Sequence, residues 1–193
     1  TLTAGEDNIN LSQKNLGPAD VTLLTEWMKR SKVSAVINSL ALGSNPIGDE
    51  AMIQLLDVLK DVSLTSFDIS TTNCGVSTAT KLAELLAEET AFRAVLASLT
   101  LDQNDIFGEL YSDGDCKEAD KYVDESAPLL DAIKISNLTS LSLSKTGMGP
   151  KICSRLATSF SAALASLTAD STGVPKLTAS WMDGYEESGP RTY

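Results

Sequence analysis

The chain contains no histidine among its 193 residues. Histidine is the usual general base for serine and cysteine nucleophiles, so its absence excludes Ser-His-Asp and Cys-His catalysis. It also removes the commonest nitrogen ligand for transition metals. The phosphate-binding patterns G-x-x-x-x-G-K-[ST] and G-x-G-x-x-G are absent as well. We therefore expect no catalytic residues and no cofactor, and we expect that the protein is not an enzyme.

Cysteine is scarce, with three residues at positions 74, 116 and 153. This odd number, without C-x-x-C or other metal-ligand spacing, argues against a disulfide framework and a zinc site. Cys74 stands at an apolar position and is expected to be buried, whereas Cys116 lies in a polar segment and is the candidate reactive thiol. Such cysteine usage favours a reducing compartment. We expect a soluble intracellular protein, in the cytoplasm or in an organelle after removal of a targeting segment.

Long apolar runs and basic residues are also lacking. No run approaches the ~20 apolar residues that a membrane-spanning helix requires. Lysine and arginine number 15 against 26 acidic residues, which gives a net charge of −11. Nucleic-acid phosphates require a basic surface, so we expect no nucleic-acid partner. We expect the partners to be one or more proteins with a basic surface.

What the sequence does contain is a recurring apolar pattern. Its clearest copy covers residues 37–48 and follows L-x-x-L-x-L-x-x-N-x-L, with isoleucine in the first and last positions. Leu40 and Leu42 alternate, which predicts a short strand with one buried face. The side-chain amide of Asn45 can satisfy backbone groups in the turn that follows. The apolar run after the turn predicts a helix that packs behind the strand.

Further copies repeat this frame. The last strand residues are separated by 31, 27, 32, 42 and 26 positions, and the longest step requires an insertion. One such unit cannot bury its own apolar face, so the units must stack on one another. The last strand residues are Leu11, Leu42, Ile69, Leu101, Leu143 and Ala169. The asparagine position departs from the pattern in four copies, which hold Lys14, Thr72, Thr146 and Thr172.

The chain resembles the leucine-rich repeat family, in its ribonuclease-inhibitor-like subtype, most closely over residues 40–51. The resemblance implies an α/β fold, a short right-handed solenoid of about six repeats. It places parallel strands on the concave side and helices on the convex side. We assign residues 1–175 to this array and residues 176–193 to a C-terminal cap or tail. Helices are expected over residues 18–29, 48–59 and 77–88, and after residues 128 and 149.

The insertion, at about residues 109–126, is the irregular part of the array. It contains seven acidic residues and two lysines. Asp113-Gly114-Asp115 resembles part of a calcium loop, but the ligand spacing and terminal glutamate of an EF-hand are missing. We therefore prefer a solvated or partner-facing acidic loop and expect no metal site.

Partner binding is expected on the insertion and the tail. The predicted concave face carries small hydroxyl side chains, among them Ser98 and Ser140, and none of the Trp, Tyr or Arg residues that usually dominate binding energy. The aromatic residues of the tail either cover the last repeat or anchor a partner. The candidate partner-binding residues are Phe107, Tyr111, Asp113, Asp115, Glu118, Tyr122, Trp181 and Tyr185.

The missing chemistry and the repeated pattern together predict a non-catalytic protein–protein interaction module or scaffold. The alternative is a structural subunit that is permanently bound in a larger multi-protein assembly. A third interpretation follows from the resemblance, because the same repeat subtype includes GTPase-activating and other enzyme-regulating proteins.

Overall fold

A computed structural model describes residues 6–30, 36–158, 163–169 and 177–180, the last four by their backbone only. The strands are β1 Asn8–Asn10, β2 Ser39–Ala41, β3 Ser66–Asp68, β4 Ser98–Thr100, β5 Glu109–Leu110, β6 Cys116–Glu118, β7 Ser140–Ser142, β8 Ser166–Ala169 and β9 Leu177–Ser180. The helices are α1 Pro18–Met28, α3 Asp49–Leu59, α4 Val76–Ala87, α5 Ala91–Val95, α6 Val123–Lys134 and α7 Pro150–Thr158.

The main sheet has the order β1-β2-β3-β4-β7-β8-β9, and its first six strands are parallel. Neighbouring strands align their central apolar residues, so that Leu40 lies opposite both Ile9 and Phe67. This register confirms the predicted parallel sheet, because each central residue is buried while its strand neighbours alternate outward. The seventh strand, β9, was not predicted and pairs antiparallel with β8.

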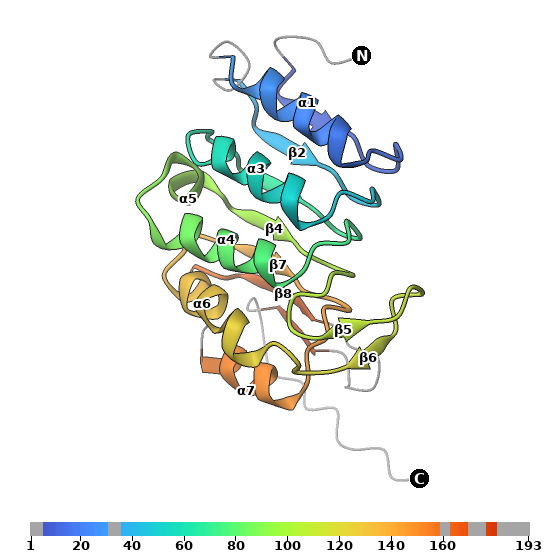
Figure 1. Cartoon of the computed structure of the whole chain (residues 1–193). Helices are drawn as coiled ribbons and strands as arrows, with labels where there is room; N and C mark the ends of the chain where they lie inside the picture. Colours follow the sequence, from blue (N-terminus) through green and yellow to red (C-terminus); the bar gives the residue numbers. More distant parts are fainter. Residues whose placement is uncertain (1–5, 31–35, 159–162, 170–176, 181–193) are drawn as a thin grey trace.

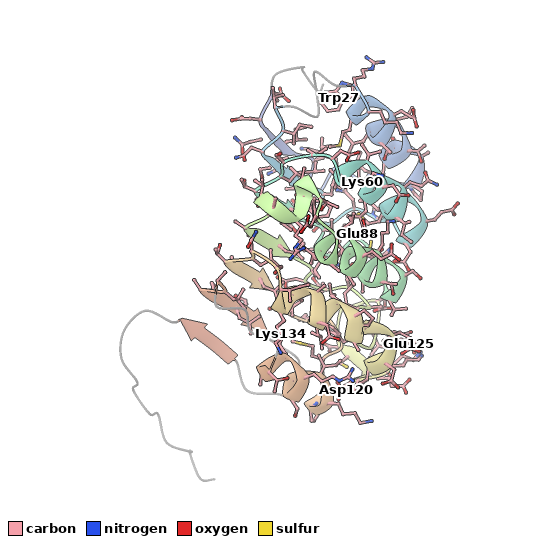
Figure 2. All side chains as sticks on the ribbon, turned by 90° about the vertical axis from the view of Figure 1, so that its left-hand side faces the viewer. Trp27, Lys60, Glu88, Asp120, Glu125 and Lys134 are labelled. Atoms are coloured by element: carbon pink, nitrogen blue, oxygen red, sulfur yellow. The ribbon has the colours of Figure 1, made fainter. Side chains whose placement is uncertain are left out.

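The helices lie on one face of this sheet and follow one another in the order of the strands (Figure 1). Each turns an apolar stripe toward the sheet: Met52 and Leu56 of α3 and Leu82 and Leu86 of α4 are fully buried. In Figure 2, the labelled C-terminal ends of α3, α4 and α6 follow one another down the molecule. The sheet and this row of helices therefore enclose one core, which is mainly aliphatic and includes Phe67, Phe92 and Phe107.

Buried asparagines satisfy backbone groups in the turns that follow the strands, as the pattern predicted, and they also join neighbouring loops, which was not predicted. Asn45 donates through Nδ2 to the carbonyl of Leu42 at 2.6 Å and to that of Leu11 at 2.9 Å. Its Oδ1 accepts the backbone N–H groups of Lys14 and Leu16. One side chain thus satisfies these four backbone groups, three of which lie on the loop that follows β1.

Threonine performs part of this task in two other loops. The Thr72 hydroxyl donates to the carbonyl of Ile69, and the Thr146 hydroxyl donates to that of Leu143, each at 2.7 Å. These two threonines therefore keep the local hydrogen bond of the turn, which is consistent with the unbroken strand register at their loops.

Acidic residues at or just before the start of one helix cap the helix that follows the next strand of the main sheet. Asp49 accepts the backbone N–H groups of Gly75 and Thr78 at the start of α4. Asp120 does the same for Gly149 and Ile152 at the start of α7. Negative charge at a helix N-terminus is stabilised by the exposed N–H groups there. Neighbouring units are therefore joined by hydrogen bonds from backbone N–H groups to carboxylates, in addition to apolar packing.

The helix bounds agree with the prediction except in the fourth copy. There α6 begins at Val123, so residues 123–126 of the predicted insertion are helical. The backbone N–H of Ser126 donates to the Tyr122 carbonyl at 2.9 Å, which closes the first turn well before Pro128. A short helix that was not predicted, α5, places Phe92 edge-on against Phe67 with ring centroids 6.0 Å apart. No helix within the described residues is long and apolar enough to cross a membrane.

Candidate partner-binding surface

The inserted segment folds as a two-stranded antiparallel hairpin, β5–β6, beside the loops at the end of the main strands (Figure 1). Its turn is closed by hydrogen bonds from the N–H of Tyr111 to Asp115 O and from the N–H of Gly114 to Tyr111 O. Gly114 has a φ of 83°, a left-handed conformation that glycine adopts without strain. The Asp113 carboxylate accepts the N–H of Asp115 within the turn.

The base of the hairpin is fixed by a close backbone crossing between Gly108 and Gly147. A Cβ atom added to Gly108 would meet the carbonyl oxygens of Glu118 at 2.3 Å and of Gly147 at 2.6 Å. On either side of this crossing, the N–H of Phe107 donates to Thr146 O and the N–H of Asp120 donates to Gly147 O. The hairpin is therefore held to the main sheet by its own backbone.

Ion pairs neutralise part of the hairpin's charge. Glu109 accepts Lys117 and Lys121 at 2.5 Å each, and Lys121 also lies 3.6 Å from Glu118. The hydrogen bonds from Lys117 and Lys121 lower the pKa of Glu109 to about 2. Within the described residues, no ion pair involves Asp113 or Asp115. The negative charge of the hairpin tip is therefore directed to the solvent.

The structure places four of the predicted residues together on this hairpin. Tyr111 is 56% exposed, and Asp113, Asp115 and Glu118 are exposed beside it. Tyr122 lies at the start of α6, is partly buried, and has the Lys121 ammonium 5.5 Å from its ring centre. These residues form one surface, which we call the hairpin surface.

Phe107, which was predicted to bind a partner, does not lie on this surface. Its side chain is fully buried and belongs to the core. It can reach a partner only by leaving the core, so its role is packing. Trp181 and Tyr185 lie outside the described residues.

Cys116 lies in β6 and is partly exposed, as expected of a residue in a polar segment. Burial and the nearby charge of Asp120 both raise the pKa of its thiol. A raised pKa lowers the thiolate fraction, which is the nucleophilic form. The structure therefore argues against a reactive role for Cys116. Over the residues that the structure describes, no group of three or more Cys, Asp or Glu residues could hold a metal ion.

The face of the sheet opposite the helices, which was predicted to be concave, is lined by small polar side chains, as predicted. It also carries acidic residues. The Ser142 hydroxyl donates to both carboxylate oxygens of Asp102, at 2.7 and 2.9 Å. Burial, with a contribution from the charge of Asp68, raises the pKa of Asp102. Asp68 and Asp102 therefore make the middle of this sheet face negative, and the described residues place no exposed aromatic side chain on it.

A polar pocket that the sequence did not predict lies between the hairpin and the loops that follow β3 and β4. Its volume is about 240 Å³. The pocket is formed only when loops about 30 residues apart in the chain are brought together, so no local sequence signal marks it. Its lining residues are Thr71, Asn73, Gln103, Asn104, Asp105, Leu110, Tyr111, Ser112 and Gly114.

Comparison with protein-family models finds no match for the chain, and comparison with curated proteins finds no similar sequence.

Proposed function

We propose that the chain is a short leucine-rich-repeat-like solenoid of about six units that binds another protein through its hairpin surface. The proposal of a stacked array is supported by the shared register of the six parallel strands. It is also supported by the Asn45 side chain, which bonds to its own loop and to the preceding one.

One observation carries the binding role. Tyr111 is 56% exposed at the tip of a hairpin whose backbone is fixed. An aromatic side chain of this kind buries a large area with little loss of conformational entropy. The acidic residues around it attract a basic surface and increase the rate of association. The favoured partner is therefore a protein with a basic patch, and the favoured role is that of a non-catalytic interaction module.

The test is affinity capture from a lysate with three forms of the protein, followed by mass spectrometry. In the first variant, Asp113, Asp115 and Glu118 are changed to lysine. In the control variant, three exposed acidic residues near helix C-termini are changed to lysine, which gives the same change in net charge. The control residues are Asp61, Glu88 and Asp131. Lysine is favourable near a helix C-terminus, so the control should remain folded.

We expect the hairpin variant to lose a protein that the wild type and the control both retain. Capture by the wild type should weaken as salt rises from 50 to 300 mM, values chosen to span the range in which exposed charges are screened. Equal capture by all three forms, together with loss of capture after bulky substitutions at Ser98 and Ser140, would assign binding to the sheet face instead. A companion that remains at fixed stoichiometry through size exclusion would indicate a structural subunit of a permanent assembly.

A further inference from the structure

The polar pocket beside the hairpin has one wall that carries negative charge. Asp105 contributes a carboxylate whose Oδ1 accepts the N–H of Leu110 at 3.1 Å. Within the described residues, Asp105 forms no ion pair. Burial is the main cause that raises the pKa of this carboxyl group. The pocket thus holds a half-buried anion that lacks a cation in contact.

The other walls are an aromatic ring and polar side chains. Tyr111 lines the pocket and remains 56% exposed, so its ring is available to a ligand. The Thr71 hydroxyl donates to Oε1 of Gln103 at 3.1 Å, which orients that amide. The two loops are joined by backbone hydrogen bonds from the N–H of Thr71 to Asp102 O at 2.8 Å and from the N–H of Asp105 to Cys74 O at 2.9 Å. The pocket is therefore preformed rather than assembled by a ligand.

We propose that this pocket binds the side chain of an arginine from the protein partner, an inference that rests on the proposed function. A guanidinium group can bind a carboxylate and at the same time stack its flat face on a tyrosine ring. The volume of about 240 Å³ lies below the roughly 300–1,000 Å³ of small-molecule sites, and suits one long side chain. Phosphate and carboxylate ligands are disfavoured, because the charge of Asp105 repels them.

The probe is the capped tripeptide acetyl-Gly-Arg-Gly-amide, titrated into ¹⁵N-labelled full-length protein and followed by NMR. The control peptide contains citrulline, which has nearly the shape of arginine but no charge. We expect saturable shifts at Gln103, Asp105, Tyr111 and Gly114 with a Kd of about 1–10 mM, which corresponds to a single anchoring side chain. The citrulline peptide should bind at least about tenfold more weakly, because it lacks the charge-assisted hydrogen bonds.

Two protein variants separate the pocket from the general acidic field. Asp105→Asn keeps an oxygen that can accept the N–H of Leu110, so the hairpin remains anchored. It should raise the Kd for the arginine peptide about tenfold. Asp113→Asn makes the same change in net charge on the neighbouring hairpin, outside the pocket lining. It should change the Kd less than about twofold, since exposed charges interact weakly.

The proposal is overturned if no saturable shift occurs up to about 100 mM peptide, ten times the upper end of the expected range, if citrulline binds equally, or if Asp105→Asn and Asp113→Asn have equal effects. These outcomes are distinct from a failure of the proposed function. Loss of peptide binding together with capture that still depends on Asp113, Asp115 and Glu118 refutes the arginine pocket alone. Capture that is the same for the wild type and the hairpin variant refutes the proposed function.

Discussion

Replacement of Asn104 by alanine tests the hydrogen-bonding role of the buried asparagines. Asn104 is 1% exposed. Its Nδ2 donates to the carbonyls of Ile69 and Leu101 at 2.7 and 3.0 Å. Its Oδ1 accepts the backbone N–H groups of Thr72 and Cys74 at 3.1 and 3.0 Å. Alanine removes the partner of all four groups and leaves them inside the protein.

The magnitude follows from the two N–H groups, since carbonyl oxygens tolerate the loss of one partner better. Each buried N–H without a partner costs about 1–3 kcal/mol, so Asn104→Ala should lower the free energy of unfolding by about 4 kcal/mol. For a chain of this length, 1 kcal/mol shifts Tm by about 2–4 °C, which gives a loss of about 8–16 °C. Differential scanning calorimetry and urea unfolding measure both quantities.

Threonine provides an internal comparison at this position. Thr72 and Thr146 occupy equivalent turns and bond to the carbonyl three residues earlier, so Asn104→Thr should keep the bond to Leu101. We expect it to be about 1 kcal/mol more stable than the alanine variant, the usual worth of one hydrogen bond. The exposed Asn137 serves as a control, and Asn137→Ala should change stability by less than about 0.5 kcal/mol. A Tm for Asn104→Ala within about 1 °C of wild type, or a threonine variant no better than alanine, would refute the reasoning.

Four further perturbations test other parts of the structure. Leu42→Asp should unfold much of the chain, because it buries an unpaired charge in a fully enclosed position; a soluble variant with unchanged melting by circular dichroism contradicts this. Gly108→Ala should detach the hairpin, since the added Cβ meets backbone oxygens at 2.3 and 2.6 Å; amide exchange should rise in residues 109–118 and remain unchanged in the main strands. Deletion of residues 110–117 should leave the main sheet folded, because these residues lie outside the core; collapse of the far-ultraviolet signal would show the opposite. The Glu109 ion pairs should survive mild acid. The pKa of Glu109 in the folded protein is about 2, below its ordinary value of 4.5, so the stability that the pairs contribute is complete above about pH 4.5 and is lost as the pH falls through about 2. An NMR titration of the carboxyl carbon with a midpoint near 4.5 would disprove the pairs.

The parallel sheet and the main helices were predictable because they depend on local periodicity. Alternating apolar pairs such as Leu40 and Leu42 can be buried in only one register, and a shift by one residue would expose them. Four helices begin within one residue of the predicted position, at Pro18, Asp49, Val76 and Pro150. The repeated frame thus contained most of the information about the core.

The hairpin, β9 and the pocket were not predictable by the same means. The β5 strand has two residues and no apolar alternation, so its pairing depends on the Gly108–Gly147 crossing and on the ion pairs of Glu109. The pocket requires Gln103, Asp105 and Tyr111 to meet, and Asp105 differs in no way from other loop aspartates at the sequence level. Phe107 was misplaced for a related reason: its position next to the insertion said nothing about the direction of its ring.

The acidic residues of the insertion, which resembled one patch in the sequence, have different roles in the fold. Asp120 caps α7, and Glu109 is bonded to two lysines. Reversal of either charge would therefore damage the structure before it affected a partner. Asp113 and Asp115 form no ion pair with the described residues and stand at the exposed tip. A loss of binding after substitution is thus most informative at these tip positions, where charge can change while the hairpin keeps its shape. Glu118 is exposed but lies 3.6 Å from Lys121, so a loss of capture by the triple variant is assigned to the surface when the change of Asp113 and Asp115 alone gives the same loss.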